Sequence, residues 1–106
     1  MTETPNLKYL DDLAQGDEGF RKKFIGILKE EFPSEKQCYL DAMENGFFRE
    51  ASEHVHKIKH KLNVLGVHKS YSLAVRHENE LRKGGNKYHM DFLSVLSEIE
   101  AYLKTI

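Results

Sequence analysis

The sequence contains little that could build a redox centre or a cysteine-based metal centre. Its 106 residues include one cysteine, Cys38, so an internal disulfide, a paired-cysteine zinc site and a Cys-x-x-Cys redox motif are all excluded. It also lacks an excess of either charge, since 16 Lys and Arg stand against 17 Asp and Glu, for a formal net charge of -1. A chain without a basic excess has no overall field that attracts nucleic acid or an acidic membrane. We therefore expect neither as a partner.

Long apolar runs are missing as well. No apolar stretch approaches the roughly 20 residues that span a bilayer, and residues 1–5 have neither the basic start nor the apolar run of a secretory signal. We therefore expect a cytoplasmic protein. There is also no Gly-x-x-x-x-Gly-Lys-Ser/Thr loop and no kinase glycine pattern. For that reason we expect no ATPase or kinase activity of the chain's own.

The chain has only two prolines and no alternating runs rich in Val, Ile and Thr, whereas apolar spacings of three and four recur almost from end to end. This pattern predicts an all-helical chain. The predicted helices cover residues 7–14, 18–32, 34–44, 47–65, 69–83 and 88–103. The second should end near Phe32-Pro33, because the residue before a proline is disfavoured in the helical conformation, and Ser34 should cap the third.

The apolar positions of these helices predict which faces are buried. The clearest stripe runs along residues 47–65, and it consists of Ala51, Val55, Ile58, Leu62 and Leu65. In residues 34–44 we expect Leu40 and Met43 to face inward, with Gln37 or Cys38 partly buried. Short connections between long amphipathic helices favour antiparallel neighbours. We predict a single all-α domain over residues 1–106, an up-and-down antiparallel four-helix bundle with an additional short N-terminal helix.

A histidine with a nearby lysine stands out on the helix predicted for residues 47–65. At about 100° per residue, His56 lies roughly 140° from the centre of the apolar stripe, so its imidazole should face solvent. Lys59 lies one turn further on, and Ser52 and Asn63 flank the same helix surface. An imidazole nitrogen can carry a phosphoryl group, and an ammonium can neutralise its oxygens. The run therefore suggests phosphate chemistry on His56.

These residues carry a resemblance to a known family. His56, Lys59 and Leu65-Gly66 stand at the positions of a His-x-x-Lys-Gly motif followed by a Leu-Gly pair. The chain thereby resembles the histidine-containing phosphotransfer (HPt) domains of multistep two-component phosphorelays. The resemblance runs from about residue 7 to residue 103, and it includes the family's helix starts and stops at Gly16-Asp17, Phe32-Pro33 and Asn45-Gly46.

The resemblance implies an up-and-down four-helix bundle and a role in signal transduction. His56 would accept a phosphoryl group from the aspartate of one response-regulator receiver domain and pass it to another, while Lys59 neutralises the phosphoryl charge. The chain would be a phosphohistidine carrier rather than an enzyme, without a cofactor of its own, because the receiver brings Mg²⁺. Its partners would be receiver domains, including those of a hybrid histidine kinase. We expect a monomer, given the charge between the apolar stripes.

The chain departs from the family immediately after the motif lysine. His60 stands where the family usually has glycine, and Lys61 stands where a small residue is common. With Ser52 and Asn63, these side chains form the predicted partner-docking surface. Either the cognate receiver has a complementary recess, or the domain binds receivers without efficient transfer, as an interaction or inhibitory module.

A metal site is the alternative of another class. His56 and His60 have the i, i+4 spacing with which two imidazoles can bind one zinc ion. Three lysines, Lys57, Lys59 and Lys61, surround the pair and should repel a cation. We therefore assign no metal ligand, and we instead expect these lysines to form a positive rim that attracts an acidic receiver pocket in a salt-sensitive way.

Overall fold

The computed structural model describes residues 3–106, which form five helices and no strands, with 78% of the residues helical. Met1 and Thr2, which belong to the N-terminal segment considered above, lie outside the described residues. The helices are α1 (Lys8–Ala14), α2 (Glu18–Glu44), α3 (Phe48–Val64), α4 (His68–Arg82) and α5 (His89–Leu103). No helix within residues 3–106 is both long enough and apolar enough to cross a membrane.

Helix α2 takes the place of two predicted helices. Its 27 residues continue through Pro33, so the predicted break at Phe32-Pro33 and the predicted cap at Ser34 are wrong. A proline inside a helix costs about 3 kcal/mol, because it lacks the N–H donor and its ring crowds the preceding turn. Pro33 is exposed, whereas Phe32 and Tyr39 are fully buried on either side of it. Burying large side chains of this kind contributes about 1.5–3 kcal/mol each, which offsets the cost of the proline.

The continuous helix also changes which side of residues 34–44 is buried. Tyr39 and Ala42 enter the core, Leu40 is only half-buried, and Gln37 and Cys38 are exposed, so the prediction for Gln37 and Cys38 is wrong. In one unbroken helix, Tyr39 follows the buried Phe32 by seven residues and must share its face. A break at Phe32-Pro33 would have made residues 34–44 a separate helix, whose buried face need not line up with that of residues 18–32.

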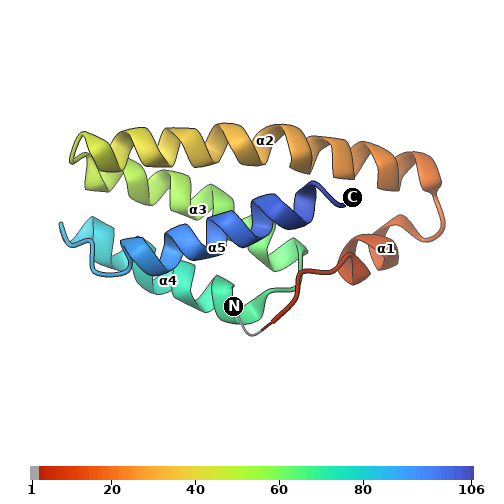
Figure 1. Ribbon diagram of the computed structural model, residues 1–106. Coiled ribbons are helices and arrows are strands. Elements are labelled where there is room, and N and C mark those ends of the chain that lie inside the picture. The colour runs from red at the N-terminus through yellow and green to blue at the C-terminus, as the bar shows by residue number, and fades with distance from the viewer. Residues whose placement is uncertain (1–2) are drawn as a thin grey trace.

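The predicted buried face of α3 is confirmed, because all five residues of its apolar stripe are at most 1% exposed. Helix α3 packs against both α2 and α4, while α5 contacts α4 and α2. Figure 1 shows α1 beneath the N-terminal part of α2, at one end of the molecule. At about 1.5 Å per residue, α2 is about 40 Å long, and it therefore spans nearly the whole 44 Å long axis.

The turns at both ends of α3 are confirmed. Gly46 and Gly66 each have a φ of 73°, in the left-handed region that favours glycine. At Gly66 there is a second constraint, because an added Cβ would lie 2.7 Å from Nδ2 of Asn6. The side chain of Asn6 accepts a hydrogen bond from the amide of Lys8, the first residue of α1, at 3.0 Å, and the backbone N–H of Asn6 donates to the Leu65 carbonyl at 2.9 Å. The glycine thus allows the N-terminal segment to close over the end of α3.

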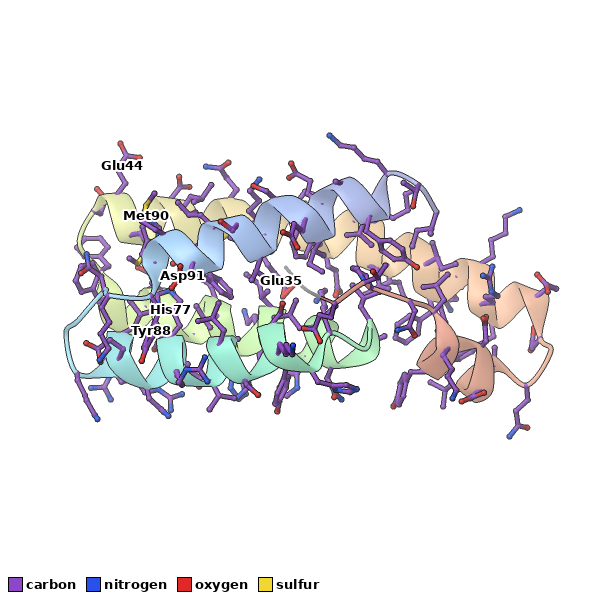
Figure 2. The ribbon with its side chains drawn as sticks, turned by 60° about the horizontal axis from the view of Figure 1, so that its bottom comes forward. Glu35, Glu44, His77, Tyr88, Met90 and Asp91 are labelled. Carbon is purple, nitrogen blue, oxygen red and sulfur yellow. The ribbon has the colours of Figure 1, made fainter. Side chains whose placement is uncertain are left out.

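A chain of polar side chains runs through the core. The hydroxyl of Tyr39 lies 2.6 Å from Nε2 of His77 and 2.7 Å from Nδ1 of His89. His77 is fully buried, and its Nδ1 has no hydrogen-bond partner in the described residues. Because an orphaned N–H costs more than an unused acceptor, we assign the proton to Nε2, which donates to Tyr39, and the Tyr39 hydroxyl then donates to His89. Figure 2 shows His77 at the end of the molecule that carries Glu44, with Glu35 further along.

This chain should make stability depend on pH. Burial, and to a smaller extent the charge of His89, lowers the pKa of His77 from 6.5 to about 4. The unfolded chain therefore binds more protons than the folded chain between these values, so the free energy of unfolding falls as the pH falls from 6.5 to 4. The contribution of His77 is fully present above pH 6.5 and amounts to about 3 kcal/mol.

Urea unfolding at a series of pH values measures this loss. His77→Phe should flatten the decrease between pH 6.5 and 4, whereas the same substitution at the exposed His68 should leave it in place. An equally steep decrease in the His77→Phe variant would show that other groups cause the acid sensitivity.

Candidate functional site

His56 lies in the middle of α3 with its side chain 48% exposed, as predicted. Both nitrogens of its imidazole have neighbours. Nδ1 lies 3.1 Å from Oε2 of Glu78 on α4, and Nε2 lies 3.3 Å from Nε2 of His60, one turn further along α3. The Glu78 carboxylate therefore holds the imidazole at Nδ1, while about half of the side chain is exposed to solvent.

Glu78 connects the residues of the site. Its side chain is 5% exposed, and besides His56 it forms ion pairs with Lys59, at 3.0 Å from Oε1, and with Arg82, at 2.6 Å from Oε2. Burial by itself would raise the pKa of the Glu78 carboxyl, but Lys59, Arg82 and His56 together lower it below its ordinary value. The carboxylate is therefore ionised at neutral pH, and it is balanced by the cations around it.

The ionised carboxylate decides which nitrogen of His56 carries the proton. A carboxylate can only accept hydrogen bonds, so the neutral imidazole must present Nδ1–H to Glu78. Nε2 is then unprotonated, and its lone pair can accept from Nε2 of His60, 3.3 Å away. We assign this tautomer from the hydrogen-bond partners. It makes Nε2 the nucleophilic atom of the site.

Lys59 lies next to His56 but is not free. Its side chain is 13% exposed, its Nζ pairs with Glu78, and it lies 5.9 Å from the centre of the Tyr71 ring. An incoming phosphoryl group would therefore have to share this ammonium with Glu78. Removing Lys59 would also leave one fewer cation beside a buried carboxylate, so its side chain contributes to stability as well as to the site.

The predicted docking residues are placed differently from one another. His60 is exposed, and its ring stands nearly perpendicular to that of His56, with the centroids 4.8 Å apart. Because Nε2 of His56 is the acceptor, Nε2–H of His60 donates to it. Asn63 is exposed, as expected. Ser52 is buried, and its hydroxyl donates to the Arg49 carbonyl at 2.5 Å, so the prediction that Ser52 lies on the docking surface is wrong.

Lys61 points toward α2 rather than into solvent. Its side chain is 13% exposed, and its Nζ lies 3.1 Å from Oε1 of Glu31 and 2.6 Å from Oε2 of Glu35. A shallow groove between α2 and α3 carries these glutamates on one side and Lys57 and His60 on the other. Of the three lysines expected to form a positive rim, only Lys57 makes no ion pair within residues 3–106. The surface beside His56 is therefore mixed in charge.

Glu78 and Arg82 were missed at the sequence level. They are four residues apart on α4, the spacing at which opposite charges pair along a helix, and this signal was available. The sequence does not reveal which face of α4 meets α3, so nothing connected Glu78 with His56. Glu78 follows His77 on the buried side of α4, and this position brings the Glu78 carboxylate to His56.

Within residues 3–106, no three His, Cys, Asp or Glu side chains are grouped so that they could hold a metal ion together. Comparisons with models of known protein families, with characterised proteins and with solved structures gave no match for this chain. The functional argument therefore depends on the geometry around His56.

Proposed function

We propose that this chain is a phosphohistidine carrier of the HPt type, which accepts a phosphoryl group from a receiver-domain aspartate on His56 and passes it to another receiver. One observation carries the proposal. The side chain of His56 is 48% exposed, its Nδ1–H donates to the buried carboxylate of Glu78, and its Nε2 is an unprotonated base whose one neighbour within hydrogen-bond distance among the described residues is the exposed His60. This combination fixes the ring, the tautomer and the direction of attack, which are what phosphoryl transfer requires of the accepting group.

In the forward step, the lone pair of Nε2 attacks the phosphorus of the receiver's aspartyl phosphate. A P–N bond forms, the P–O bond to the aspartate breaks, and the carboxylate leaves with the bonding electrons. The imidazole becomes positively charged, and the Glu78 carboxylate at Nδ1 stabilises this charge. Lys59, which is shared with Glu78, would supply positive charge to the phosphoryl oxygens, and the receiver would bring Mg²⁺. Transfer to the second receiver is the reverse of this step.

The fold that we propose for this role is one up-and-down four-helix bundle, formed by α2, α3, α4 and α5, with α1 as the additional N-terminal helix. The short turns between α2 and α3 and between α3 and α4 support it, as do the contacts of α5 with α2 and α4 (Figure 1). A rigid bundle suits a carrier, because the receiver needs only one exposed helix face. Two receivers can then use the same face in turn, and a monomer suffices.

The docking surface in this proposal consists of His60, Asn63, Lys57 and the groove toward Glu31, with Lys61 forming part of the groove wall. His60 has the largest effect on access, because it covers Nε2 of His56 and must turn aside before phosphorus can approach. The same observation favours the second candidate function, a domain that binds receivers without transfer. In that case His60 would stay on Nε2 in the complex.

Phosphotransfer from a panel of phosphorylated receiver domains, analysed without acid treatment, distinguishes the two functions. We expect at least one receiver to label the native chain within minutes, and a second to remove the label. If receivers bind the chain but none labels it, the second candidate function is correct and the carrier role is wrong.

A further inference from the structure

We infer that His56 and His60 form a two-histidine site for a divalent transition-metal ion, and that a bound ion occupies the nitrogen needed by the phosphoryl group. The metal site itself is independent of the proposed function. Only its regulatory consequence rests on that function. The sequence suggested the pair through its i, i+4 spacing, and the structure adds the orientation of the rings and the charges around them.

The distance between the two nitrogens fits a shared ion. Nε2 of His56 and Nε2 of His60 face each other at 3.3 Å. Zinc binds imidazole nitrogen at about 2.0–2.1 Å, and two ligands at a tetrahedral angle are therefore about 3.3–3.4 Å apart. The separation of the two nitrogens therefore fits one ion bound by both rings without a change in the backbone of α3. Water would complete its coordination, because no third protein ligand is grouped with the pair within residues 3–106.

Glu78 prepares His56 for this role. Histidine ligands commonly donate their second N–H to a carboxylate, which fixes the tautomer and raises the basicity of the metal-binding nitrogen. The contact of 3.1 Å between Nδ1 of His56 and Glu78 is of this kind. His60 is exposed and needs only to move its proton from Nε2 to Nδ1 through solvent. The ion then replaces the hydrogen bond between the two rings.

The lysines around the histidine pair repel a metal ion less in the structure than the sequence alone suggests. Lys59 pairs with Glu78, which it shares with Arg82, and Lys61 pairs with Glu31 and Glu35. Lys57 is the one lysine of the three without an ion pair in the described part of the chain. The electrostatic cost of placing a cation between His56 and His60 is reduced accordingly.

Two imidazoles define the class of ion. Nitrogen ligands favour Zn²⁺, Ni²⁺ and, most strongly, Cu²⁺, whereas Mg²⁺ requires oxygen ligands. The site should therefore ignore the Mg²⁺ that phosphotransfer uses. An ion on Nε2 of His56 removes the lone pair that attacks phosphorus, so transition metals should block phosphorylation while Mg²⁺ supports it.

Calorimetric titration of the untagged protein with Zn²⁺ or Ni²⁺ tests the site directly. We expect binding of one ion per chain, weakened at least tenfold by His60→Ala and by His60→Gln, and no binding of Mg²⁺. His54→Ala, which removes a histidine from the same helix two residues before His56, should keep the native affinity within twofold. Unchanged affinity in both His60 variants, or no binding at millimolar Zn²⁺, would overturn the inference.

The regulatory consequence has a separate test. Phosphoramidate can phosphorylate histidine without a receiver, so the probe needs no partner protein. We expect Zn²⁺, at a concentration that saturates the calorimetric site, to slow labelling of the native chain at least tenfold. Labelling at the native rate with the site saturated would refute the regulatory role while leaving the metal site in place. A chain that binds zinc but is never labelled would instead count against the proposed function.

Discussion

Replacing His56 with glutamine should abolish phosphoryl labelling by receivers. Glutamine has nearly the length of histidine and can still meet Glu78 through its amide N–H, but it has no nitrogen lone pair that can attack phosphorus. The side chain is 48% exposed and lies outside the core, so the fold should remain intact. Labelling is measured with a phosphorylated receiver under acid-free conditions, and the far-ultraviolet circular dichroism confirms the helices.

The matched control is the same substitution at His54, on the same helix but two residues earlier. His54→Gln should be labelled at the native rate, since His54 takes no part in the site. Equal labelling of native chain and His56→Gln would place the phosphoryl group elsewhere and end the carrier role of His56.

The second large effect is expected at Glu78. Glu78→Ala removes the acceptor for Nδ1–H of His56 and leaves Lys59 without its counter-ion. Loss of a group that orients a reactive histidine typically costs tenfold to hundredfold, and we expect a decrease of about that size in the rate of transfer. Because the pair is buried, the free energy of unfolding should fall by about 3 kcal/mol. Single-turnover transfer and urea unfolding measure the two effects.

Glu78→Gln separates positioning from charge. The amide oxygen can still accept from Nδ1–H, so the part of the transfer rate that depends on positioning should return, while the part that depends on the negative charge beside the imidazolium should stay lost. Part of the stability loss should also remain, because Lys59 and Arg82 are unpaired. The imidazole nitrogen signals of His56 report the tautomer independently, and they should show a protonated Nδ1 in the native chain and in Glu78→Gln but a mixture in Glu78→Ala.

An exposed glutamate on α3 provides the control for these variants. Glu53→Ala should change neither the transfer rate nor the stability by more than a small amount. If Glu78→Ala transfers at the native rate, Glu78 is only a structural partner of Lys59 and Arg82, and the positioning role is wrong.

The buried face of α3 could be predicted because its apolar positions repeat without interruption. Val55 and Ile58 are buried, as their spacing predicts. The exposure of His56 followed from the same periodicity, since a residue on the side of the helix opposite the buried stripe faces solvent. The predicted helix start at residue 18 is also correct, and there the carboxylate of Asp17 accepts from the Phe20 amide at 3.0 Å.

The break at Pro33 could not be judged from local preference. A proline disfavours the helix by a few kcal/mol, and the opposing burial of Phe32 and Tyr39 depends on helices distant in the sequence. The burial of Ser52 likewise depends on helices that are distant in the sequence. Ser52 lies one turn before His56, but it also adjoins the buried Ala51, and it is covered once α3 is packed against its neighbours. The edge of a buried stripe is set by the neighbouring helices and not by the spacing alone.

The site illustrates why a pattern within one helix is incomplete. His56, Lys59 and His60 share α3, and their spacing indicated phosphate chemistry or a metal. Glu78, which selects the reactive nitrogen and engages the lysine, comes from another helix. Its role depends on how α4 packs against α3, which has no signature in either segment.

The central claim is that Nε2 of His56 carries the phosphoryl group, and nuclear magnetic resonance of the phosphorylated chain tests it most directly. With uniform ¹⁵N labelling, the phosphorus–nitrogen coupling identifies the residue and the nitrogen, provided that the sample is kept at alkaline pH to preserve the P–N bond. We expect one phosphorylated imidazole, His56, bonded through Nε2 and with its proton on Nδ1. A phosphoryl group on Nδ1, on His60 or on any other residue would contradict the account.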